Sequence, residues 1–315
     1  MANVLVVGGA GYVGGAVTDQ LMQTSHNVRV YDSLLYEDSF RKPVSFVLGD
    51  IRDEEKLLAH LRWADVVVWL AAIVGDGACA LNPDIATEIN QHGVARLAKH
   101  FDGRIVFLST CSVYGAQESE LDESSPTNPL SVYAATKLAA EQSLTNQNAI
   151  SFRLGTLYGI GDLFSRVRLD LVVNTLVVKA FTQGRITVYG GGQHRPLLHV
   201  KDAAQAIVEN IETDHCGIVN LHHENVQIID LAFQFRNHFP DVEIECTEMK
   251  FLDARNYRVS SKKAISTFGF HPKYTVDDGI VELKTLLEEG RLKDIGDPRY
   301  SNHHLLKKTL EPLHE

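Results

Sequence analysis

Apolar residues in the first half of the chain follow two alternating patterns. Short runs that are apolar at nearly every position are typical of strands buried on both faces of a parallel sheet. Between them, apolar residues recur every three or four positions, as in amphipathic helices. The strand-like runs are residues 3–7, 27–31, 44–48, 66–71, 104–108 and 150–154, and two of the helix-like segments are 84–100 and 132–144. The alternation predicts an α/β fold with a doubly wound parallel sheet, in which ligands gather at the carboxyl ends of the strands.

The pattern changes after residue 160, where glycines interrupt the chain more often. Helix-like stretches persist at 171–181, 201–212, 228–238 and 276–289. We therefore expect residues 1–160 to form the main sheet domain. Residues 161–315 are expected to form mainly a smaller mixed α/β substrate-binding region, with elements around 198–222 returning to the main sheet. The polar tail from Asp294 onward is expected to be peripheral.

Composition narrows the class of protein. Of the 315 residues, 44% are hydrophobic and 22% charged, which is ordinary for a globular protein and argues against global disorder. The formal net charge of −10, without any Lys/Arg-rich block, argues against nucleic acid as a partner. No apolar run is long enough to span a membrane. The four cysteines form no CxxC pair, so a reducing cytoplasm is the expected location; they are Cys79, Cys111, Cys216 and Cys246.

Three glycines stand between the first predicted strand and the helix that follows it. Gly8 allows a tight turn, Gly11 lets the backbone approach a pyrophosphate, and Gly14 lets helix and sheet pack closely. Asp32 ends the second strand, 18 residues after Gly14, where a carboxylate binds a ribose diol and repels a 2′-phosphate. The alternative is that the glycines serve only a turn and Asp32 only caps a strand. The context favours a Rossmann sheet that binds NAD, with residues 1–160 as the NAD-binding domain.

Further cofactor contacts are expected where the next strands end. Asp50 is predicted to meet the adenine amino group, whereas Asp53 is interpreted as the N-cap of a helix. Small residues after the fourth strand let a cofactor pass close to the backbone, although helix packing would also explain them. The full set predicted to bind the cofactor, besides the glycines and Asp32, is Tyr12, Val13, Asp50, Ile51, Leu70, Ala71, Ala72, Tyr133 and Lys137.

The last two of these carry the predicted chemistry. Tyr133 and Lys137 are four residues apart in a helical stretch and so project from one face. A phenol with a pKa near ~10 is a poor base at neutral pH, and a neighbouring ammonium favours the phenolate. Ser109 or Thr110, at the end of the fifth strand, is the candidate hydroxyl that positions a reacting alcohol. The spacing alone occurs often by chance, and the preceding nucleotide motif gives it weight.

Taken together, these motifs resemble those of the extended short-chain dehydrogenase/reductases. Within them, the chain is similar to the NAD-dependent nucleotide-sugar epimerase/dehydratase family, and the resemblance spans most of its length. It rests on the glycine motif, Asp32, the Ser-Thr…Val-Tyr-Gly segment 108–115, the Tyr133/Lys137 pair, and Phe152-Arg153…Leu157-Tyr158-Gly159. Segments 70–75, 168–174 and 253–260 resemble, more narrowly, the subgroup of GDP-heptose C4 dehydrogenases and related epimerase-like enzymes.

The resemblance implies a nucleotide-diphosphate sugar as substrate and oxidation at its C4 hydroxyl. Thr110, Asn174, Arg195 and Arg255 would contact this substrate, Arg195 through the diphosphate. The 4-keto sugar would either take the hydride back on its other face, giving an epimer, or leave, giving a net C4 dehydrogenase. A third alternative is an inactive NAD-binding sensor or scaffold.

Departures from the family pattern limit the chemistry. The related dehydratases carry Asp-Glu after the catalytic Thr, whereas Cys111 and Ser112 stand here, so dehydration is disfavoured. The fourteen histidines show no metal-ligand spacing, and no metal site is expected. Arg166 and Arg168 are either phosphate ligands or exposed residues. The resemblance also implies a homodimer, built on helices 84–100 and 131–144. Half of each helix's apolar residues must also cover the sheet; the apolar residues are Ile85, Ile89, Val94, Leu97, Val132, Leu138 and Leu144.

Overall fold

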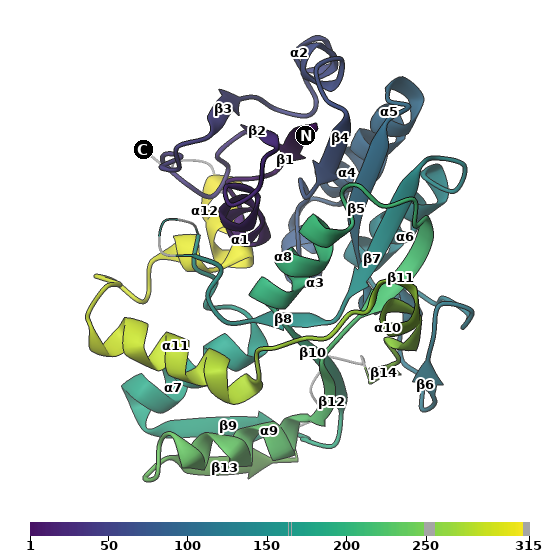
Figure 1. Cartoon of the computed structure of the whole chain (residues 1–315). Helices are drawn as coiled ribbons and strands as arrows, with labels where there is room; N and C mark the ends of the chain where they lie inside the picture. Colours follow the sequence, from purple (N-terminus) through teal and green to yellow (C-terminus); the bar gives the residue numbers. More distant parts are fainter. Residues whose placement is uncertain (163, 165, 249–255, 311–315) are drawn as a thin grey trace.

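A seven-stranded sheet forms the centre of the molecule (Figure 1). The computed structural model describes residues 1–162, 164, 166–248 and 256–310. All neighbouring strands of this sheet run parallel, in the order β11-β7-β5-β4-β1-β2-β3. Their bounds are β1 Asn3–Val7, β2 Asn27–Asp32, β3 Ser45–Leu48, β4 Val66–Trp69, β5 Arg104–Thr110, β7 Ala149–Leu154 and β11 Gly217–Leu221. The predicted doubly wound fold is confirmed, and β11 joins the sheet from the second half of the chain.

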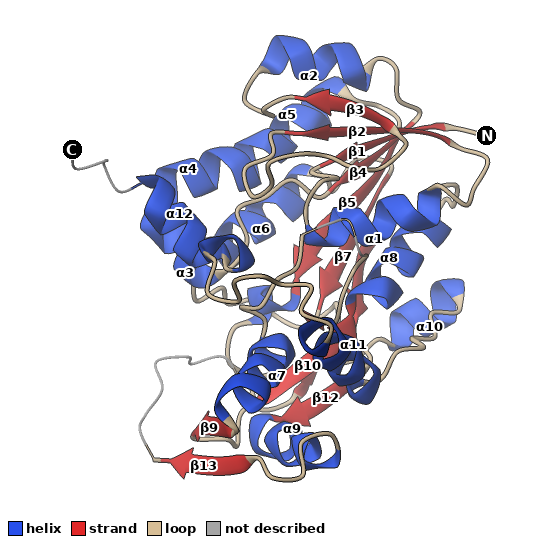
Figure 2. Cartoon of the chain, turned by 90° about the vertical axis from the view of Figure 1, so that its left-hand side faces the viewer, coloured by secondary structure: helices blue, strands red, loops and turns tan. Residues whose placement is uncertain are grey.

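Helices cover both faces of the sheet (Figure 2). Because side chains alternate along a strand, Val4 and Val6 of β1 face one helical layer, while Leu5 and Val7 face the other. The first layer contains α1 Tyr12–Leu21, α8 Val200–Glu209 and α10 Lys262–Phe268, and the second contains α2 Glu54–Leu61, α5 Gly93–His100 and α6 Val132–Ser143. Helices therefore shield both faces of the sheet from water, and for this reason the strands are apolar at nearly every position.

This layering shows which residues of the expected dimer helices cover the sheet instead. Val94, Leu97 and Leu144 are buried against the sheet in the second layer and so are not available to an interface. Ile85, Ile89 and Val132 pack, partly buried, around a smaller cluster near α3 Asp76–Leu81 and α4 Pro83–Thr87. Leu138 is also only partly buried.

The second half of the chain builds a smaller region below the carboxyl ends of the strands. Its core lies between α7 Val172–Gln183, α9 Ile228–Gln234 and α11 Val276–Glu288. Three small sheets belong to this part or border it: β8 Thr156–Tyr158 with β10 His194–His199 and β12 Glu224–Gln227; β9 Arg185–Tyr189 with β13 Glu243–Thr247; and β6 Glu120–Leu121 with β14 Arg258–Val259. No helix among the described residues has the length and apolar character needed to cross a bilayer.

The C-terminal tail is not peripheral, contrary to the expectation from its polar sequence. Helix α12, Asn302–Leu310, packs on α3 (Figure 2). Leu306 is only 6% exposed and joins a cluster that includes Ile73 and Cys79. One apolar face on an otherwise polar helix is enough to dock it.

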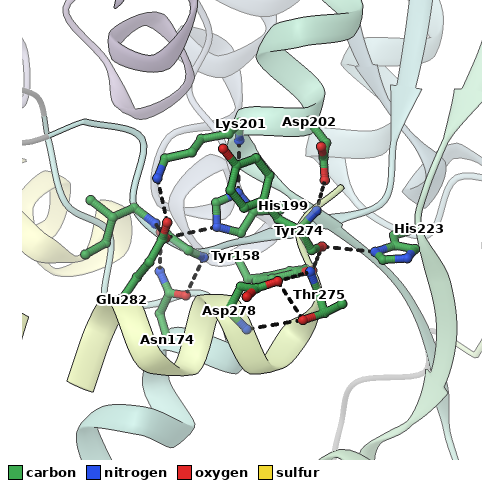
Figure 3. Close-up of polar contacts among 12 residues, drawn as sticks. Tyr158, Asn174, His199, Lys201, Asp202, His223, Tyr274, Thr275, Asp278 and Glu282 are labelled. Atoms are coloured by element: carbon green, nitrogen blue, oxygen red, sulfur yellow. Dashed lines mark hydrogen bonds and ion pairs between the residues drawn. The ribbon is translucent and has the colours of Figure 1, made fainter. Parts of the chain in front are cut away.

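A partly buried ionic cluster around the buried His199 joins the two halves (Figure 3). Glu282 of α11 accepts hydrogen bonds from Lys201 Nζ at 2.5 Å and from the backbone N–H of Ile160 at 3.1 Å, and its Oε2 lies 3.0 Å from His199 Nε2. The Nδ1 of His199 accepts from the Lys201 N–H, so Nε2 donates to Glu282. Burial raises the pKa of Glu282, but the hydrogen bonds from His199 and Lys201 outweigh burial and hold this pKa at about 2.

The low pKa of Glu282 predicts how the free energy of unfolding depends on pH. The pKa of Glu282 is lower in the folded chain than its ordinary 4.5, so its contribution is complete above pH 4.5 and is lost as the pH falls towards 2. We expect Glu282→Gln to lower the free energy of unfolding by about 2 kcal/mol at pH 7, measured by urea titration. The difference from wild type should shrink below pH 4.5. Glu288→Gln, at an exposed site of the same helix, is the control, and an equal loss in both variants would contradict the account.

Candidate active site

The glycine-rich loop is shaped by contacts that exclude a side chain. Gly8 has φ +85°, and a Cβ there would lie 2.4 Å from the backbone N of Ala71, which follows β4. At Gly14 a Cβ would lie 2.6 Å from the backbone of Gly9. Gly11 is the N-cap of α1 and offers no side-chain cap, so the first N–H groups of the helix stay available for an anion. The loop is thus a cradle for a diphosphate.

Asp32 holds the chain around the predicted ribose site. Its carboxylate accepts hydrogen bonds from the N–H of Ala10 at 3.0 Å and of Leu34 at 2.7 Å. Burial raises the pKa of Asp32, against the lowering effect of these backbone donors. Leu34, at φ +55°, is the one residue other than glycine with positive φ in the described chain, so the backbone turns sharply beside the carboxylate.

The two predicted aspartates after β3 have different surroundings. Asp53 is the N-cap of α2 and accepts from the N–H of Lys56, which confirms its interpretation. Asp50 is ion-paired with Arg52 at 2.6 Å, and this hydrogen-bonded contact lowers the pKa of Asp50. Asp50 nevertheless borders the same cavity as the glycine loop.

The predicted catalytic residues meet at the end of β5. Thr110 ends this strand, and Tyr133 lies in the first turn of α6, whose N-cap Ser131 accepts from the N–H of Ala134 and donates to Asp76. Burial raises the pKa of the Tyr133 phenol above its usual value, as do Cys79 and Asp76. Arg168 and a hydrogen bond with Thr110 act in the opposite direction.

Lys137 follows Tyr133 by one turn and is buried. Its Nζ lies 4.2 Å from the centre of the Phe107 ring. Burial lowers the pKa of Lys137 to about 7, although the negative charge of Glu141 one turn further opposes this. An ammonium with this pKa gives up its proton far more readily than an exposed lysine does.

The structure separates Ser109 from Thr110. The hydroxyl of Ser109 is bonded to Glu141, which forms a buried ion pair with Arg153 at 2.6 Å. Thr110 instead accepts from the N–H of Ser112 and faces Tyr133. Of the two candidates, Thr110 therefore has the position of a substrate-binding hydroxyl, while Ser109 supports the helix that carries Lys137.

A π-helical turn, Glu88–His92, interrupts the helix predicted over 84–100. It turns the fully buried Asn90 toward the segment after β4, where its side chain accepts from the Ile73 N–H at 2.8 Å and donates to the Ile73 carbonyl at 2.9 Å. Asn90 also donates to Thr136 on α6. Such turns are frequent at functional sites, and this one ties the predicted cofactor wall to the catalytic helix.

The predicted substrate residues do not all reach the site. Arg195 is buried and borders the cavity. Asn174 (labelled in Figure 3) does not reach it, since its fully buried amide accepts from the Gly159 N–H and donates to the Arg168 carbonyl. Arg255 lies outside the described residues. Tyr257, near Arg255 in the chain, borders the cavity and was not predicted.

One cavity of about 960 Å³ collects these groups. Every residue predicted to bind the cofactor borders it, as do Ser109, Thr110 and Arg195. Its unpredicted walls come from the segment after β2, from the loop before α7 and from α12. The residues of these walls include Tyr36, Arg166, Arg168, Asn302, His303 and Leu306. In the sequence they were signalled only by the apolar pair Leu305-Leu306 in the polar tail and by two arginines, Arg166 and Arg168, whose role was left open. The arrangement fits a dinucleotide beside a base and a hydroxyl.

Comparison with known proteins identifies the family. A model of the NAD dependent epimerase/dehydratase family matches residues 4–221, more than half of the chain. The chain belongs to this family. Membership confirms the predicted family and NAD as the cofactor, and it agrees with a glycine cradle followed by the Asp32 carboxylate.

Individual relatives act on nucleotide sugars. The chain is 32% identical to UDP-glucose 4-epimerase of Streptomyces lividans, over 64% of this chain and 69% of that one. It is 26% identical to UDP-glucuronic acid decarboxylase 6 of Arabidopsis thaliana, over 94% and 91%. The fold matches the crystal structure of UDP-glucose 4-epimerase from Thermotoga maritima with UDP-glucose, with a TM-score of 0.80, 21% identity and coverage of 92% and 99%.

The position of Asp32 predicts the choice of dinucleotide. Asp32→Asn keeps an acceptor for the N–H groups of Ala10 and Leu34 but removes the charge that repels a 2′-phosphate. We expect the ratio of NADP to NAD dissociation constants, measured by fluorescence titration, to fall about tenfold or more, since tenfold corresponds to roughly 1.4 kcal/mol. Asp50→Asn, at the adenine end, is the control and should leave the ratio unchanged. An unaltered ratio in Asp32→Asn would refute the assignment.

Proposed function

We propose that this protein oxidises the C4 hydroxyl of a nucleotide-diphosphate sugar, with NAD, as part of a sugar 4-epimerase cycle. The observation that carries the proposal is that the Tyr133 phenol and its hydrogen-bonding partner Thr110 border the same cavity as the glycine cradle and Asp32. A base and a hydroxyl beside a bound dinucleotide allow a proton to pass to the base and a hydride to pass to the dinucleotide. The UDP-sugar relatives make UDP-glucose the first substrate to test.

The two halves of the chain would divide the work. Residues 1–160, with α8 and β11, bind the dinucleotide in this proposal, and the remainder binds the sugar nucleotide. Arg195, buried in β10 and facing the cavity, supplies a guanidinium for the sugar's diphosphate. Arg255 would act beside it.

In the reaction, Tyr133 removes the proton from the C4 hydroxyl and Thr110 holds that hydroxyl by a hydrogen bond. Bound NAD supplies the hydride acceptor and, in the second half of the cycle, the donor. Arg168 lowers the pKa of the Tyr133 phenol against the cost of burial, and Lys137 in its protonated form adds to this effect. The 4-keto sugar then rotates so that its other face receives the returning hydride, and Tyr133 gives the proton back to the same oxygen, so the side chains end each cycle as they began it.

The neighbours of Thr110 support epimerisation over elimination of water. The thiol of Cys111 is fully buried and bonded to the Arg153 carbonyl, and burial raises the pKa of Cys111 above its usual range. Ser112 is bonded to Thr110. Neither provides the carboxyl acid and base that elimination across a sugar ring needs.

The proposal includes a cytoplasmic homodimer. None of the four cysteines is in a disulfide, as expected in a reducing compartment. Helices α5 and α6 lie side by side over the sheet, and small side chains such as Ala95 and Ala135 occupy exposed positions there. Small exposed residues let a second pair of helices approach closely, giving a four-helix contact between two copies.

The dimer can be tested by charge insertion. We expect wild type to sediment at micromolar concentration with twice the mass of the chain, and Ala135→Arg to sediment as a monomer because it buries an unpaired cation in the contact. Val281→Arg, exposed on α11, should remain dimeric. A wild-type monomer would refute the dimer.

Removal of the phenol tests the catalytic assignment. Tyr133→Phe keeps the ring but loses the proton acceptor, and we expect kcat with UDP-glucose and NAD to fall by about 10²–10⁴-fold, the range for one acid–base group. Product formation is followed chromatographically. NAD affinity should change little, which separates loss of chemistry from loss of binding. Activity within a factor of three of wild type would exclude Tyr133 as the base.

A further inference from the structure

Arg166 is a buried guanidinium in the wall of the cavity. Its side chain comes from the loop that precedes α7, and the residue is only 4% exposed. Nε and Nη2 donate to the backbone carbonyl of Arg299 at 3.2 and 3.0 Å, and Nη1 donates to the amide oxygen of Asn302. These contacts fix the plane of the guanidinium but supply no negative charge.

Within the described part of the chain, Arg166 forms no ion pair with a carboxylate. Its neighbour Arg168 differs, because two of its nitrogens reach the Asp170 carboxylate at 2.9 and 3.0 Å. Burial, and then the charge of Arg168, lower the pKa of Arg166 to about 10, while the more distant carboxylates of Asp170 and Glu37 offset only part of this effect. An unpaired charge in a buried site is costly, so its retention in a cavity wall points to an anionic ligand.

Burial among neutral acceptors does not by itself indicate a ligand. Arg104 is also buried and donates to the Asn210 carbonyl and to neutral side chains. It begins β5, however, at the opposite end of the strand from Thr110, and it is not among the residues that border the cavity. Arg166 differs from Arg104 because it is a buried cation without an ion pair that also borders the ligand cavity.

A second polar group beside Arg166 lacks a partner. The ring of Tyr36, from the segment after β2, lies 4.0 Å from the guanidinium carbon of Arg166. The Tyr36 hydroxyl is enclosed and has no hydrogen-bond partner within residues 1–162, 164, 166–248 and 256–310. Tyr36 also borders the cavity, so a donor and a cation are presented together.

The position of this pair identifies which anion it meets. Residues 159–161, which precede Arg166 in the chain, lie against the start of α1: the Tyr12 hydroxyl donates to the Gly159 carbonyl at 2.8 Å, and Gly161 approaches the Tyr12 carbonyl. Tyr36 comes from the other side, four residues after Asp32. The segments that carry Arg166 and Tyr36 therefore both adjoin elements of the glycine cradle, and both residues border its cavity, whereas Arg195 is carried by β10 of the second region.

We propose that Arg166 and Tyr36 form the second half of the diphosphate site for the dinucleotide, opposite the N–H groups of the glycine cradle. The inference rests on NAD as the cofactor of the proposed function. Of the five N–H groups of the guanidinium, three donate to Arg299 and Asn302, and the second N–H of Nη1 and of Nη2 is left for phosphate oxygens. The Tyr36 hydroxyl donates to a further oxygen.

Arg166 also connects the diphosphate site to the C-terminal helix. Asn302, the first residue of α12, accepts from Arg166, donates through Nδ2 to the Val74 carbonyl at 2.8 Å, and donates through its N–H to Asp170 at 2.9 Å. Val74 borders the cavity beyond β4. One buried amide thus holds the guanidinium, the cofactor wall and the start of α12 in a fixed relation.

The test is binding of phosphate-bearing and phosphate-free ligands to full-length protein, measured by calorimetry. We expect Arg166→Gln to weaken NAD and ADP by about ten- to a hundredfold, as for one charged hydrogen-bonded contact, while adenosine and UDP bind as in wild type. Arg41→Gln, an exposed cation of the segment after β2, should change none of the four. Without ligand, Arg166→Gln should melt close to wild type, since the lost contacts are offset by removal of an unpaired charge.

Each other outcome overturns the proposal. Unchanged NAD and ADP affinity removes Arg166 from the site, and equal weakening of adenosine makes its role structural. Weakening of UDP instead of ADP assigns Arg166 to the sugar nucleotide. If Arg166→Gln does not fold, Arg166→Lys decides, because a point charge should weaken ADP several-fold but not adenosine. The ligand test measures dissociation constants and no turnover, so its result does not depend on whether the epimerase proposal is correct.

Discussion

The contact between Gly8 and the end of β4 is the constraint on which the site depends. Only a residue without a Cβ, in a left-handed conformation, lets the turn after β1 touch the backbone of Ala71. That contact brings the free N–H groups of α1 and the wall formed by residues 70–73 to one end of the sheet. The parallel order of the strands then delivers Asp32 and Thr110 to the same edge, because the carboxyl ends of parallel strands coincide.

Burial has opposite consequences for the two charged groups of the catalytic helix. It raises the pKa of the Tyr133 phenol and lowers that of Lys137, so both groups are driven toward their neutral forms. Nearby charges counteract this: Arg168 acts on Tyr133, and Glu141, fixed by Ser109 and Arg153, acts on Lys137. The protonation of Tyr133 and Lys137 thus depends on charged groups from other parts of the fold as well as on their own burial.

The sequence predicted what is encoded locally. Strands, the glycine cradle, Asp32 and the Tyr133/Lys137 pair follow from spacing within short segments, and the structure brings all of them to one cavity. It did not predict features made by contacts between distant segments. The tail after Asp294 is mostly polar, and only the docking of Leu306 on α3 shows that it closes the cavity. Arg166 could not be distinguished from an exposed arginine until Asn302 and Tyr36 were placed beside it. Asn174 carried a family motif, yet Gly159 and Arg168 occupy its amide.

The central claim is that the hydrogen removed from C4 returns to the same carbon. It is tested most directly with UDP-glucose carrying deuterium at C4, incubated with the protein and NAD and analysed by mass spectrometry and NMR. The account predicts a product of unchanged mass that is the C4 epimer and keeps its deuterium. A product lighter by the transferred deuterium and one proton, with labelled NADH in solution, would instead make the protein a net dehydrogenase. Loss of water would contradict the assignment of Cys111 and Ser112.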